Sequence, residues 1–220
     1  MQTPPCTTEE RARHWDSAYS RNGVRGVSWH QDAPAVSLEL IEALGVRHDA
    51  AVIDIGGGAS TLGDHLVERG FVDVSVLDVS AAALEEGRRR QGDGASASWL
   101  HEDLLAWRPE RRFALWHDRA VLHFLVASSE RELYLRTLRA AMPVEGGHVI
   151  VASFAADGPE VCSGLPVRRS SVADLTELLG PEFELLETRR EEHVTPRGAM
   201  QPFTWIAGRM RSGSSAVRSV

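Results

Sequence analysis

A glycine-rich turn at residues 54–61 is the strongest chemical feature of the sequence. An apolar run, 51–55, leads directly into Asp54-Ile55-Gly56-Gly57-Gly58-Ala59-Ser60-Thr61, and a helical pattern follows. Such a turn points several backbone amides toward one place at a helix N-terminus. We therefore expect a ligand to approach the backbone at Gly56, Gly57, Gly58 and Ser60. The alternative is a tight strand-to-helix turn that binds nothing.

A carboxylate at the end of the next apolar run narrows the kind of ligand. Asp78 follows the run 72–77 and lies 22 residues after Gly56. A carboxylate at this place accepts hydrogen bonds from the two hydroxyls of a ribose. Asp54 would repel a pyrophosphate, and Thr61 replaces the third glycine of the dinucleotide fingerprint. A nucleoside with an ammonium and a sulfonium fits better, and S-adenosylmethionine has both.

The composition excludes several classes of function. The chain has 220 residues, of which 43% are hydrophobic and 25% charged, and its net charge of −7 fits one soluble α/β domain without nucleic-acid partners. All 24 basic residues are arginine, which excludes Schiff-base chemistry and a P-loop. Cys6 and Cys162 are too few for a disulfide framework, and we expect no metal site. Without an apolar run of membrane length or a secretory signal, we expect a cytoplasmic protein.

The elements around these residues predict a doubly wound α/β fold with a mostly parallel, seven-stranded sheet. Apolar runs alternate with helical patterns, and the last two runs have no helix between them, which favours an antiparallel C-terminal hairpin at the edge. The expected strands are 51–55, 72–77, 97–101, 113–116, 148–154, 183–188 and 203–208. The expected helix starts are Thr61 with Asp64, Ser80, Ser129 with Glu132, and Ser171 with Asp174.

The segment before the first strand predicts a helical cap. Two helical patterns, 8–21 and 34–44, place the cap at 8–45, in front of a core at 51–209 and a tail at 212–220, all within one domain, 1–220. We expect residues 8–30, called the lid segment here, to close over the ligand with Trp15, Tyr19 and Trp29. The alternative is ordinary packing of an amphipathic helix.

Taken together, the motifs resemble those of the class I S-adenosylmethionine-dependent methyltransferases, over about residues 34–209. The residues that carry the resemblance are Val52 to Thr61, Asp78-Val79-Ser80, Glu102-Asp103-Leu104 and Trp116-His117-Asp118. Trp15-Asp16 with Tyr19, Ser28-Trp29 and the segment 118–125 are similar to a bacterial branch of that family. More distantly, they are similar to seven-strand protein lysine methyltransferases with an Asp-Lys-Gly segment, from which Arg119-Ala120 departs.

The resemblance implies roles for single residues. Gly56 and Gly58 would pass under the methionine moiety, Asp78 with Val79 would hold the ribose, and Asp103 with Leu104 would frame the adenine. His117 and Asp118 would line the floor under the sulfonium; the alternative is a hydrogen-bonded pair at a strand end. Asp103 could instead be a helix N-cap.

A base is optional in methyl transfer, because the protein mainly aligns donor and nucleophile. If a base is used, His123 and His117 are the first candidates, ahead of His30 and His193, although each could be structural. We expect the loop at 155–165 to form a wall of the acceptor site. Cys162 in that loop could meet the substrate or be a small buried residue.

The sequence thus predicts transfer of a methyl group from S-adenosylmethionine to an N, O or S nucleophile of a small molecule, leaving S-adenosylhomocysteine. A protein side-chain (lysine-type) methyltransferase is the alternative. A nicotinamide-dependent oxidoreductase and a non-catalytic cofactor-binding module are less favoured.

Overall fold

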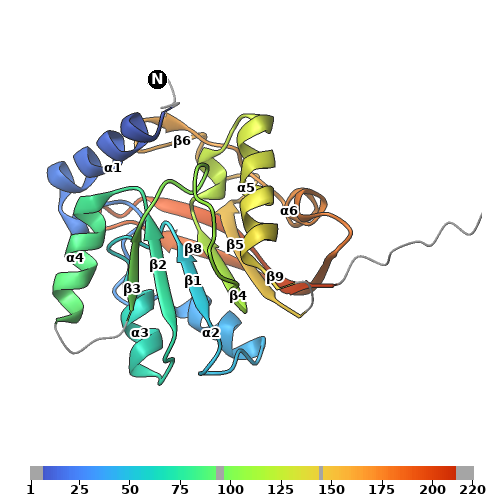
Figure 1. Ribbon diagram of the computed structural model, residues 1–220. Coiled ribbons are helices and arrows are strands. Elements are labelled where there is room, and N and C mark those ends of the chain that lie inside the picture. Colours follow the sequence, from blue (N-terminus) through green and yellow to red (C-terminus); the bar gives the residue numbers. More distant parts are fainter. Residues whose placement is uncertain (1–6, 93–96, 144–145, 212–220) are drawn as a thin grey trace, which may run out of the picture.

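A seven-stranded sheet forms the centre of the molecule (Figure 1). The computed structural model describes residues 7–92, 97–143 and 146–211, so Cys6 and the predicted tail at 212–220 lie outside the described residues. The strand order is β3-β2-β1-β4-β5-β9-β8. The strands are β1 Val52–Ile55, β2 Val74–Asp78, β3 Ser98–His101, β4 Leu115–Arg119, β5 His148–Phe154, β8 Phe183–Val194 and β9 Met200–Met210.

The predicted fold class is confirmed. Strands β1 to β5 are parallel, whereas β9 pairs antiparallel with both β5 and β8 at the edge. Some predicted bounds were wrong: β4 begins and ends later than 113–116, and β8 and β9 are longer than 183–188 and 203–208. Half of the residues of β8 are charged and most are at least partly exposed, so its outer half carries no apolar run that would mark it as a strand.

Helices cover both faces of the sheet. The helices are α1 Thr8–Asn22, α2 Ala35–Ala43, α3 Leu62–Glu68, α4 Ala81–Gln91, α5 Ser128–Ala141 and α6 Val172–Leu179. Leu40 of α2 and Leu66 of α3 belong to the core on one face, and Leu138 of α5 and Leu175 of α6 to the core on the other. Neighbouring strand residues alternate between the two cores, as Val52 and Ile53 do. Helix α2 is therefore a covering helix of the sheet and does not belong to a lid, which corrects the predicted cap at 8–45.

Three of the four predicted helix starts are confirmed, since Thr61, Ser80 and Ser171 are the N-cap residues of α3, α4 and α6. The Ser80 hydroxyl accepts from the Ala83 amide, and Ser171 forms a capping box with Asp174. The predicted box of Thr61 with Asp64 is wrong, because the Thr61 hydroxyl donates to the Gln31 carbonyl and Asp64 pairs with Arg90. The start at Ser129 with Glu132 is also wrong. Helix α5 begins at Ser128, where Glu130 accepts from the Ala127 amide.

The segment between β5 and α6 forms a small separate hairpin. Its strands, β6 Val161–Cys162 and β7 Leu165–Pro166, pair antiparallel. No helix crosses over before α6 in this segment, in agreement with the turn-forming residues that the sequence shows there.

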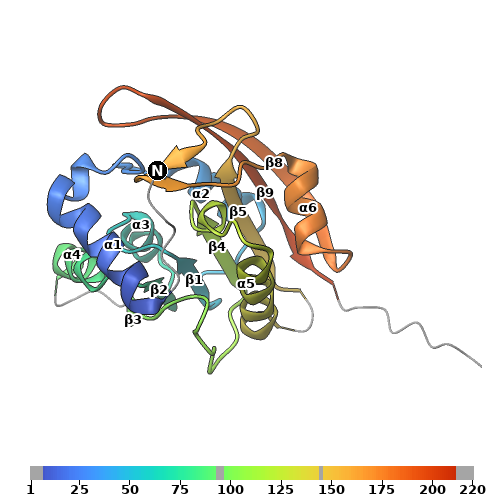
Figure 2. The ribbon, with the colours of Figure 1, turned by 90° about the horizontal axis from the view of Figure 1, so that it is seen from above.

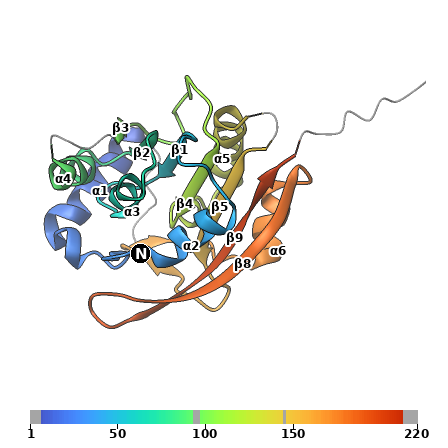
Figure 3. The same cartoon turned by 90° about the horizontal axis from the view of Figure 1, so that it is seen from below.

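The long hairpin of β8 and β9 extends beyond the rest of the sheet (Figures 2 and 3). Its outer end reaches the lid segment, where His193 Nε2 donates to the Ser28 carbonyl oxygen at 2.7 Å. Arg197 donates to the Asn22 side chain at 3.3 Å. The hairpin therefore supports the N-terminal part of the chain from the far edge of the sheet.

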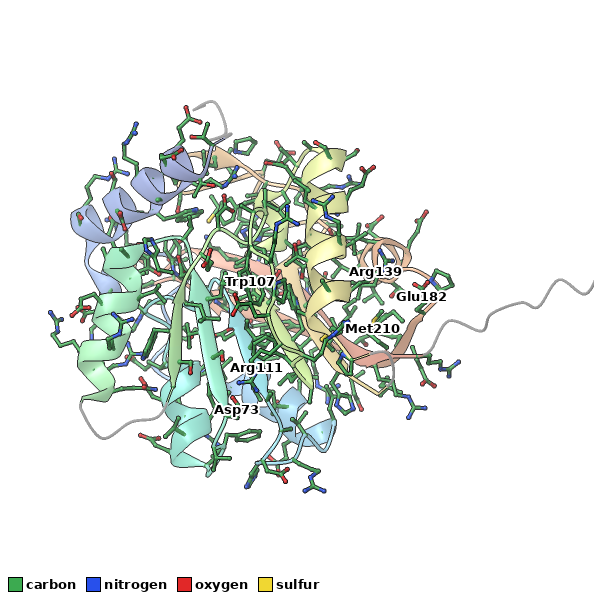
Figure 4. The ribbon with its side chains drawn as sticks, viewed as in Figure 1. Asp73, Trp107, Arg111, Arg139, Glu182 and Met210 are labelled. Carbon is green, nitrogen blue, oxygen red and sulfur yellow. The ribbon has the colours of Figure 1, made fainter. Side chains whose placement is uncertain are left out.

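Several charged pairs lie at the surface, away from the carboxyl ends of the parallel strands. Arg111 pairs with Asp73, and Arg139 lies 3.6 Å from Glu182, and these pairs are labelled in Figure 4. Exposed pairs of this kind contribute little to stability. Within the described ranges, no helix is long and apolar enough to cross a membrane.

Candidate active site

The glycine loop leaves no room for side chains. Gly56 and Gly58 have φ angles of +64° and +40°, in the left-handed region that favours glycine. A Cβ at Gly56 would lie 2.2 Å from Val121 Cγ2, and one at Gly58 would lie 2.6 Å from Asp78 Oδ2. The amide of Gly57 donates to the carbonyl of Leu77 at 3.2 Å, which joins the loop to the end of β2. The loop backbone and the Asp78 carboxylate therefore lie against each other.

Asp78 is a buried carboxylate with unused capacity to accept hydrogen bonds. Its Oδ1 accepts from the Ser80 amide at 2.8 Å, while Oδ2 faces Gly58. Burial, together with the nearby carboxylates of Asp54 and Asp16, raises the pKa of Asp78 to about 7. Hydrogen-bond donors of a bound ligand would stabilise the ionised Asp78 carboxylate and lower its pKa.

Asp54 lies at the end of β1 and is paired directly with β4. Asp54 and His117 are register partners on neighbouring strands and point to the same face. His117 Nδ1 lies 2.7 Å from Asp54 Oδ1, and Nε2 lies 3.0 Å from the Ser37 hydroxyl of α2. Both ring nitrogens of His117 are therefore engaged inside the protein.

Asp103, after β3, is engaged by the first helix. Its Oδ2 accepts from the Thr8 hydroxyl at 2.7 Å and from Arg11 Nη2 at 2.6 Å, and its Oδ1 accepts from the Leu105 amide. Burial opposes ionisation, but the hydrogen bonds from Arg11 and Thr8 hold the pKa of Asp103 below its usual value. In this structure, side chains of α1 thus take up the hydrogen-bonding capacity of Asp103 Oδ2, whereas the sequence predicted that Asp103 would contact an adenine.

The lid segment is closed over the carboxyl ends of the strands. Asp16 Oδ1 accepts from the Ser80 hydroxyl at 2.6 Å and from the Ala82 amide at 3.2 Å, which fixes α1 to the start of α4. Trp29 Nε1 donates to the Tyr19 hydroxyl, and Trp15 packs edge-on against Trp29 at 5.7 Å. Three aromatic side chains are thus presented to the space above the sheet.

One cavity lies beneath this lid and above the strand ends. It has an empty volume of about 920 Å³, which includes space that opens to solvent. Of the residues singled out by the sequence, those that line it are Trp15, Tyr19, Trp29, Gly56, Asp78, Val79, Asp103, Leu104, His123 and Cys162. A smaller cavity shares Tyr19, Trp29, Gly56 and Arg119 with it and adds Asp54, Gly57, Ser60, His30 and His117. The structure thus brings most of the predicted site residues to one place.

Asp118 does not take the place expected of it. It borders neither cavity; its Oδ1 accepts from the Val121 amide at 2.9 Å, and its carboxylate interacts with Tyr134 on the α5 side. Successive residues of a strand point to opposite faces, so His117 and Asp118 cannot both line one floor. Burial raises the pKa of Asp118 to about 6, but this carboxyl belongs to the interior, not to the cleft.

His123 lines the large cavity and is fully buried. Neither ring nitrogen has a hydrogen-bond partner in the described part of the chain. Burial, together with the positive charges of Arg119 and Arg131, lowers the pKa of His123 to about 3. The imidazole is neutral near pH 7 and holds a proton poorly, which argues against the general base that the sequence suggested.

The sequence missed several residues at the end of the cavity away from Asp78. The clearest are Arg119, Phe154, Gln201 and Phe203. Phe154 ends β5 and is the register partner of Phe203 near the start of β9, so the antiparallel pairing of β9 with β5 brings both to the ligand edge. The predicted strands at 148–154 and 203–208 already contained Phe154 and Phe203. Ala120 has a φ of +75°, a conformation that glycine would adopt without strain.

Among the residues that the structure describes, no group of three or more His, Cys, Asp or Glu side chains is arranged to hold a metal ion. The polar groups of the cavity fit an organic ligand: amides at the glycine loop, a carboxylate at Asp78 and aromatic faces in the lid.

Comparison with known proteins agrees with this geometry. A SAM-dependent methyltransferase from Anabaena variabilis has a TM-score of 0.70 and 20% identity, with 96% of this chain and 98% of that chain covered. The 1,6-didemethyltoxoflavin-N1-methyltransferase of Burkholderia thailandensis, solved with 1,6-didemethyltoxoflavin and S-adenosylhomocysteine, has a TM-score of 0.68 and 19% identity, covering 96% and 93%.

A curated relative also matches part of the chain. The eEF1A lysine and N-terminal methyltransferase of Mus musculus is 26% identical over 156 residues, or 68% of this chain and 22% of that protein. The chain thus spans about a fifth of the length of that relative. No family model matches. Together, the strand order and the structural neighbours show that this chain has the seven-strand Rossmann-like fold of the class I S-adenosylmethionine-dependent methyltransferases.

Proposed function

We propose that the chain transfers the methyl group of S-adenosylmethionine to a small-molecule acceptor and releases S-adenosylhomocysteine. The observation that carries the proposal is a single cavity that joins Gly56 and Asp78 to a second, aromatic compartment around His123. One end suits a nucleoside and the other an acceptor. A module that only binds the cofactor would not need the second compartment.

The cofactor end favours this nucleoside over a dinucleotide. The strand ends are acidic, with Asp54, Asp78 and Asp103 at three neighbouring strands, so they would repel a pyrophosphate and attract a ligand with positive charges. The Asp78 carboxylate would accept from the ribose hydroxyls, and the loop from Gly56 to Gly58 would pass beneath the methionine moiety. Asp103 and Leu104 would flank the adenine.

The reaction itself asks little of the protein. A lone pair of the acceptor attacks the methyl carbon, the carbon–sulfur bond breaks, and its electron pair stays on sulfur. The sulfonium charge disappears, so a site that aligns both partners and excludes water suffices. The closed lid segment, with Trp15, Tyr19 and Trp29 over the cavity, supplies that exclusion.

A protein side chain is the second candidate acceptor. It is favoured by the partial match to the mouse eEF1A lysine and N-terminal methyltransferase. It is opposed by Arg119, whose cation lines the cavity and would repel a lysine ammonium, and by the lid that covers the strand ends. A small acceptor fits the enclosed site better.

Two measurements test the proposal. Calorimetric titration with S-adenosylhomocysteine should give binding, while reduced nicotinamide adenine dinucleotide should give none. Release of S-adenosylhomocysteine should then be measured with a panel of small nucleophiles and with a lysine-containing peptide. Binding of the dinucleotide alone would overturn the proposed cofactor, and turnover of the peptide alone would move the acceptor to the second candidate.

A further inference from the structure

The acceptor compartment is lined by a cluster of packed aromatic rings and by two polar side chains, His123 and Arg119. The ring of His123 lies 4.4 Å from that of Phe124, 4.4 Å from that of Phe154 and 6.2 Å from that of Phe203, measured between centroids. All four side chains line the cavity. Aromatic walls of this kind favour flat, unsaturated ligands, because ring faces stack and ring edges meet faces.

His123 is one polar group of the compartment, and it lacks a partner. Its two ring nitrogens are buried without hydrogen bonds to any described residue. A buried polar group left unpaired is costly, so a ligand that supplies the missing hydrogen bond is favoured. The neutral imidazole can donate from one nitrogen and accept at the other.

Arg119 is the second polar group, and it brings a positive charge. Its guanidinium lies 4.6 Å from the centroid of Phe203, and Nη1 donates to the Trp29 carbonyl at 3.2 Å. Nε and Nη2 are buried and make no hydrogen bond to a described residue. Nε faces Glu191 Oε2 at 3.6 Å, so Nη2 is the group of this planar cation that is left for a ligand.

One carboxylate pairs with Arg119, but it leaves Nη2 without an acceptor among the described residues. Glu191 of β8 lies 3.6 Å from Nε, but its oxygens accept from Trp205 at 3.0 Å and from Gln31 at 2.6 Å. Asp54 of β1 interacts with Arg119 at longer range, and His123 and His193 both face its positive charge. An anionic ligand atom would complete the environment of the guanidinium.

The other titratable groups near this compartment do not offer a base. Burial raises the pKa of the Cys162 thiol, and burial likewise raises the pKa of Tyr19, so both are protonated near pH 7. His117 is engaged with Asp54 and Ser37. Within the described lining, the carboxylates Asp78, Glu102 and Asp103 belong to the strand ends of β2 and β3, at the cofactor end.

We infer that the acceptor is a planar small molecule that binds as a delocalised oxygen or nitrogen anion, with its ring among Phe124, Phe154 and Phe203 and its anionic edge on Arg119. His123 hydrogen-bonds a second polar atom of the ring. The inference rests on the proposed function and names the substrate class of that site.

Charge balance is simple for such an acceptor. The acceptor loses its proton to solvent before or on binding, because Arg119 stabilises the anion. A lone pair of the anion forms the new bond to the methyl carbon, and the electrons of the breaking carbon–sulfur bond remain on sulfur. An anion and a sulfonium thus become two neutral products, and no protein base is needed.

A binding experiment tests the inference without turnover. The probe is 4-nitrophenol, whose phenolate absorbs visible light, titrated into the protein saturated with S-adenosylhomocysteine. The complex should hold the phenolate at a pH where free 4-nitrophenol is mostly neutral. Nitrobenzene, which is flat but not acidic, and 4-nitrobenzylamine, which is cationic, should bind at least about tenfold more weakly, the loss of one charge-assisted contact.

Three variants locate the effect. Arg119→Gln should remove the preference for the phenolate, and Arg119→Lys should keep part of it. Arg189→Gln is the control. It removes one positive charge from an exposed position of β8 and should leave binding unchanged. If Arg119→Gln does not fold, the preference for the phenolate is tested with Arg119→Lys and with the neutral and cationic probes on the parent protein.

Turnover gives an independent test. In a series of nitrophenols of different acidity, the acidic limb of the pH profile of kcat/KM should move with the pKa of the acceptor. A limb fixed at one pH for every acceptor would show a protein base and overturn the inference, as would preference for the cationic probe. Absence of S-adenosylhomocysteine binding would instead overturn the proposed function, and the inference with it.

Discussion

The two ends of the cavity are built in different ways. At the cofactor end, Gly56, Asp78 and Asp103 follow three neighbouring parallel strands, and each lies at the point where its strand ends. At the acceptor end, Trp29, Arg119 and Phe203 come from the lid segment, from β4 and from the antiparallel strand β9, far apart in the sequence. The cofactor end is formed by the parallel strands of the sheet. The acceptor end forms only when the lid segment, β4 and β9 pack together.

The cofactor end is a feature of the fold in general, whereas the acceptor end is specific to this chain. A parallel sheet places its strand ends at one edge whatever the side chains are, so the cofactor end follows from the topology. The acceptor end depends on an antiparallel hairpin and a lid, which can differ between proteins of the same fold. Changes at the first end should abolish binding of the cofactor, and changes at the second should alter only what is methylated.

The largest effect is expected at Gly58. In Gly58→Ala, the new Cβ would lie 2.6 Å from Asp78 Oδ2 at a φ of +40°, so the carboxylate that is proposed to hold the ribose must move. We expect the affinity for S-adenosylhomocysteine to fall at least about a hundredfold in calorimetry. Gly45→Ala is the control, because Gly45 has a similar φ of +64° and no atom within 4 Å of a new Cβ. Equal affinity in both folded variants would contradict the loop assignment.

Asp78 should come next. Asp78→Asn removes a charged acceptor worth about 1.5–3 kcal/mol per hydrogen bond, so affinity should fall about ten- to a hundredfold. The pKa of Asp78 is about 7, and the ionised form is the better acceptor for ribose hydroxyls. In the parent protein, affinity should therefore rise as the pH increases through about 7, and in Asp78→Asn it should not.

The Asp78 carboxyl should also make the stability of the protein depend on pH, in the direction opposite to that of the cofactor affinity. Its pKa is raised on folding, so its favourable contribution is complete below the unfolded pKa near 3.8 and is lost as the pH rises toward about 7. Urea unfolding without ligand should show the free energy of unfolding of the parent falling over this range relative to Asp78→Asn. A constant difference between the two proteins would exclude a raised pKa at Asp78.

A smaller effect is expected where the lid is attached. Asp16→Ala removes the acceptor for the Ser80 hydroxyl and the Ala82 amide, so α1 should open more often. We expect faster hydrogen exchange over residues 8–22 and a loss of affinity for S-adenosylhomocysteine of about threefold to tenfold. Asp49→Ala, at an exposed carboxylate paired with Arg47, should change neither. Unaltered exchange in Asp16→Ala would show that this contact does not hold the lid.

The smallest effect is expected at Cys162. The thiol is buried 4.0 Å from the Ser28 hydroxyl, and burial raises its pKa, so it is a poor nucleophile. Cys162→Ser should keep the affinity for S-adenosylhomocysteine and change KM for the acceptor by less than about threefold. Loss of turnover at unchanged KM would instead give the thiol a part in the reaction.

The sequence predicted the cofactor end far better than the acceptor end. The glycine loop and Asp78 could be found because each is a local pattern at the end of an apolar run. The prediction for Asp118 was wrong, because successive residues of a strand point to opposite faces and His117 takes the face of Asp54. Phe203 and Arg119 could not be joined from sequence, since their contact depends on the register of β9 and on the lid.

The contacts that close the lid were equally beyond the sequence. Arg11 and Thr8 meet Asp103 across more than ninety residues, and no local pattern marks such a pairing. The same holds for His193 and Ser28. Long-range polar contacts of this kind follow from the assembled fold and cannot be read from residue spacing.

The most direct test of the account is a crystal structure of the protein with S-adenosylhomocysteine. The account predicts both ribose hydroxyls within hydrogen-bond distance of the Asp78 carboxylate, the homocysteine moiety over Gly56, and the sulfur directed toward the compartment of His123 and Phe203. A nucleoside bound elsewhere, or bound with its sulfur directed away from that compartment, would contradict it.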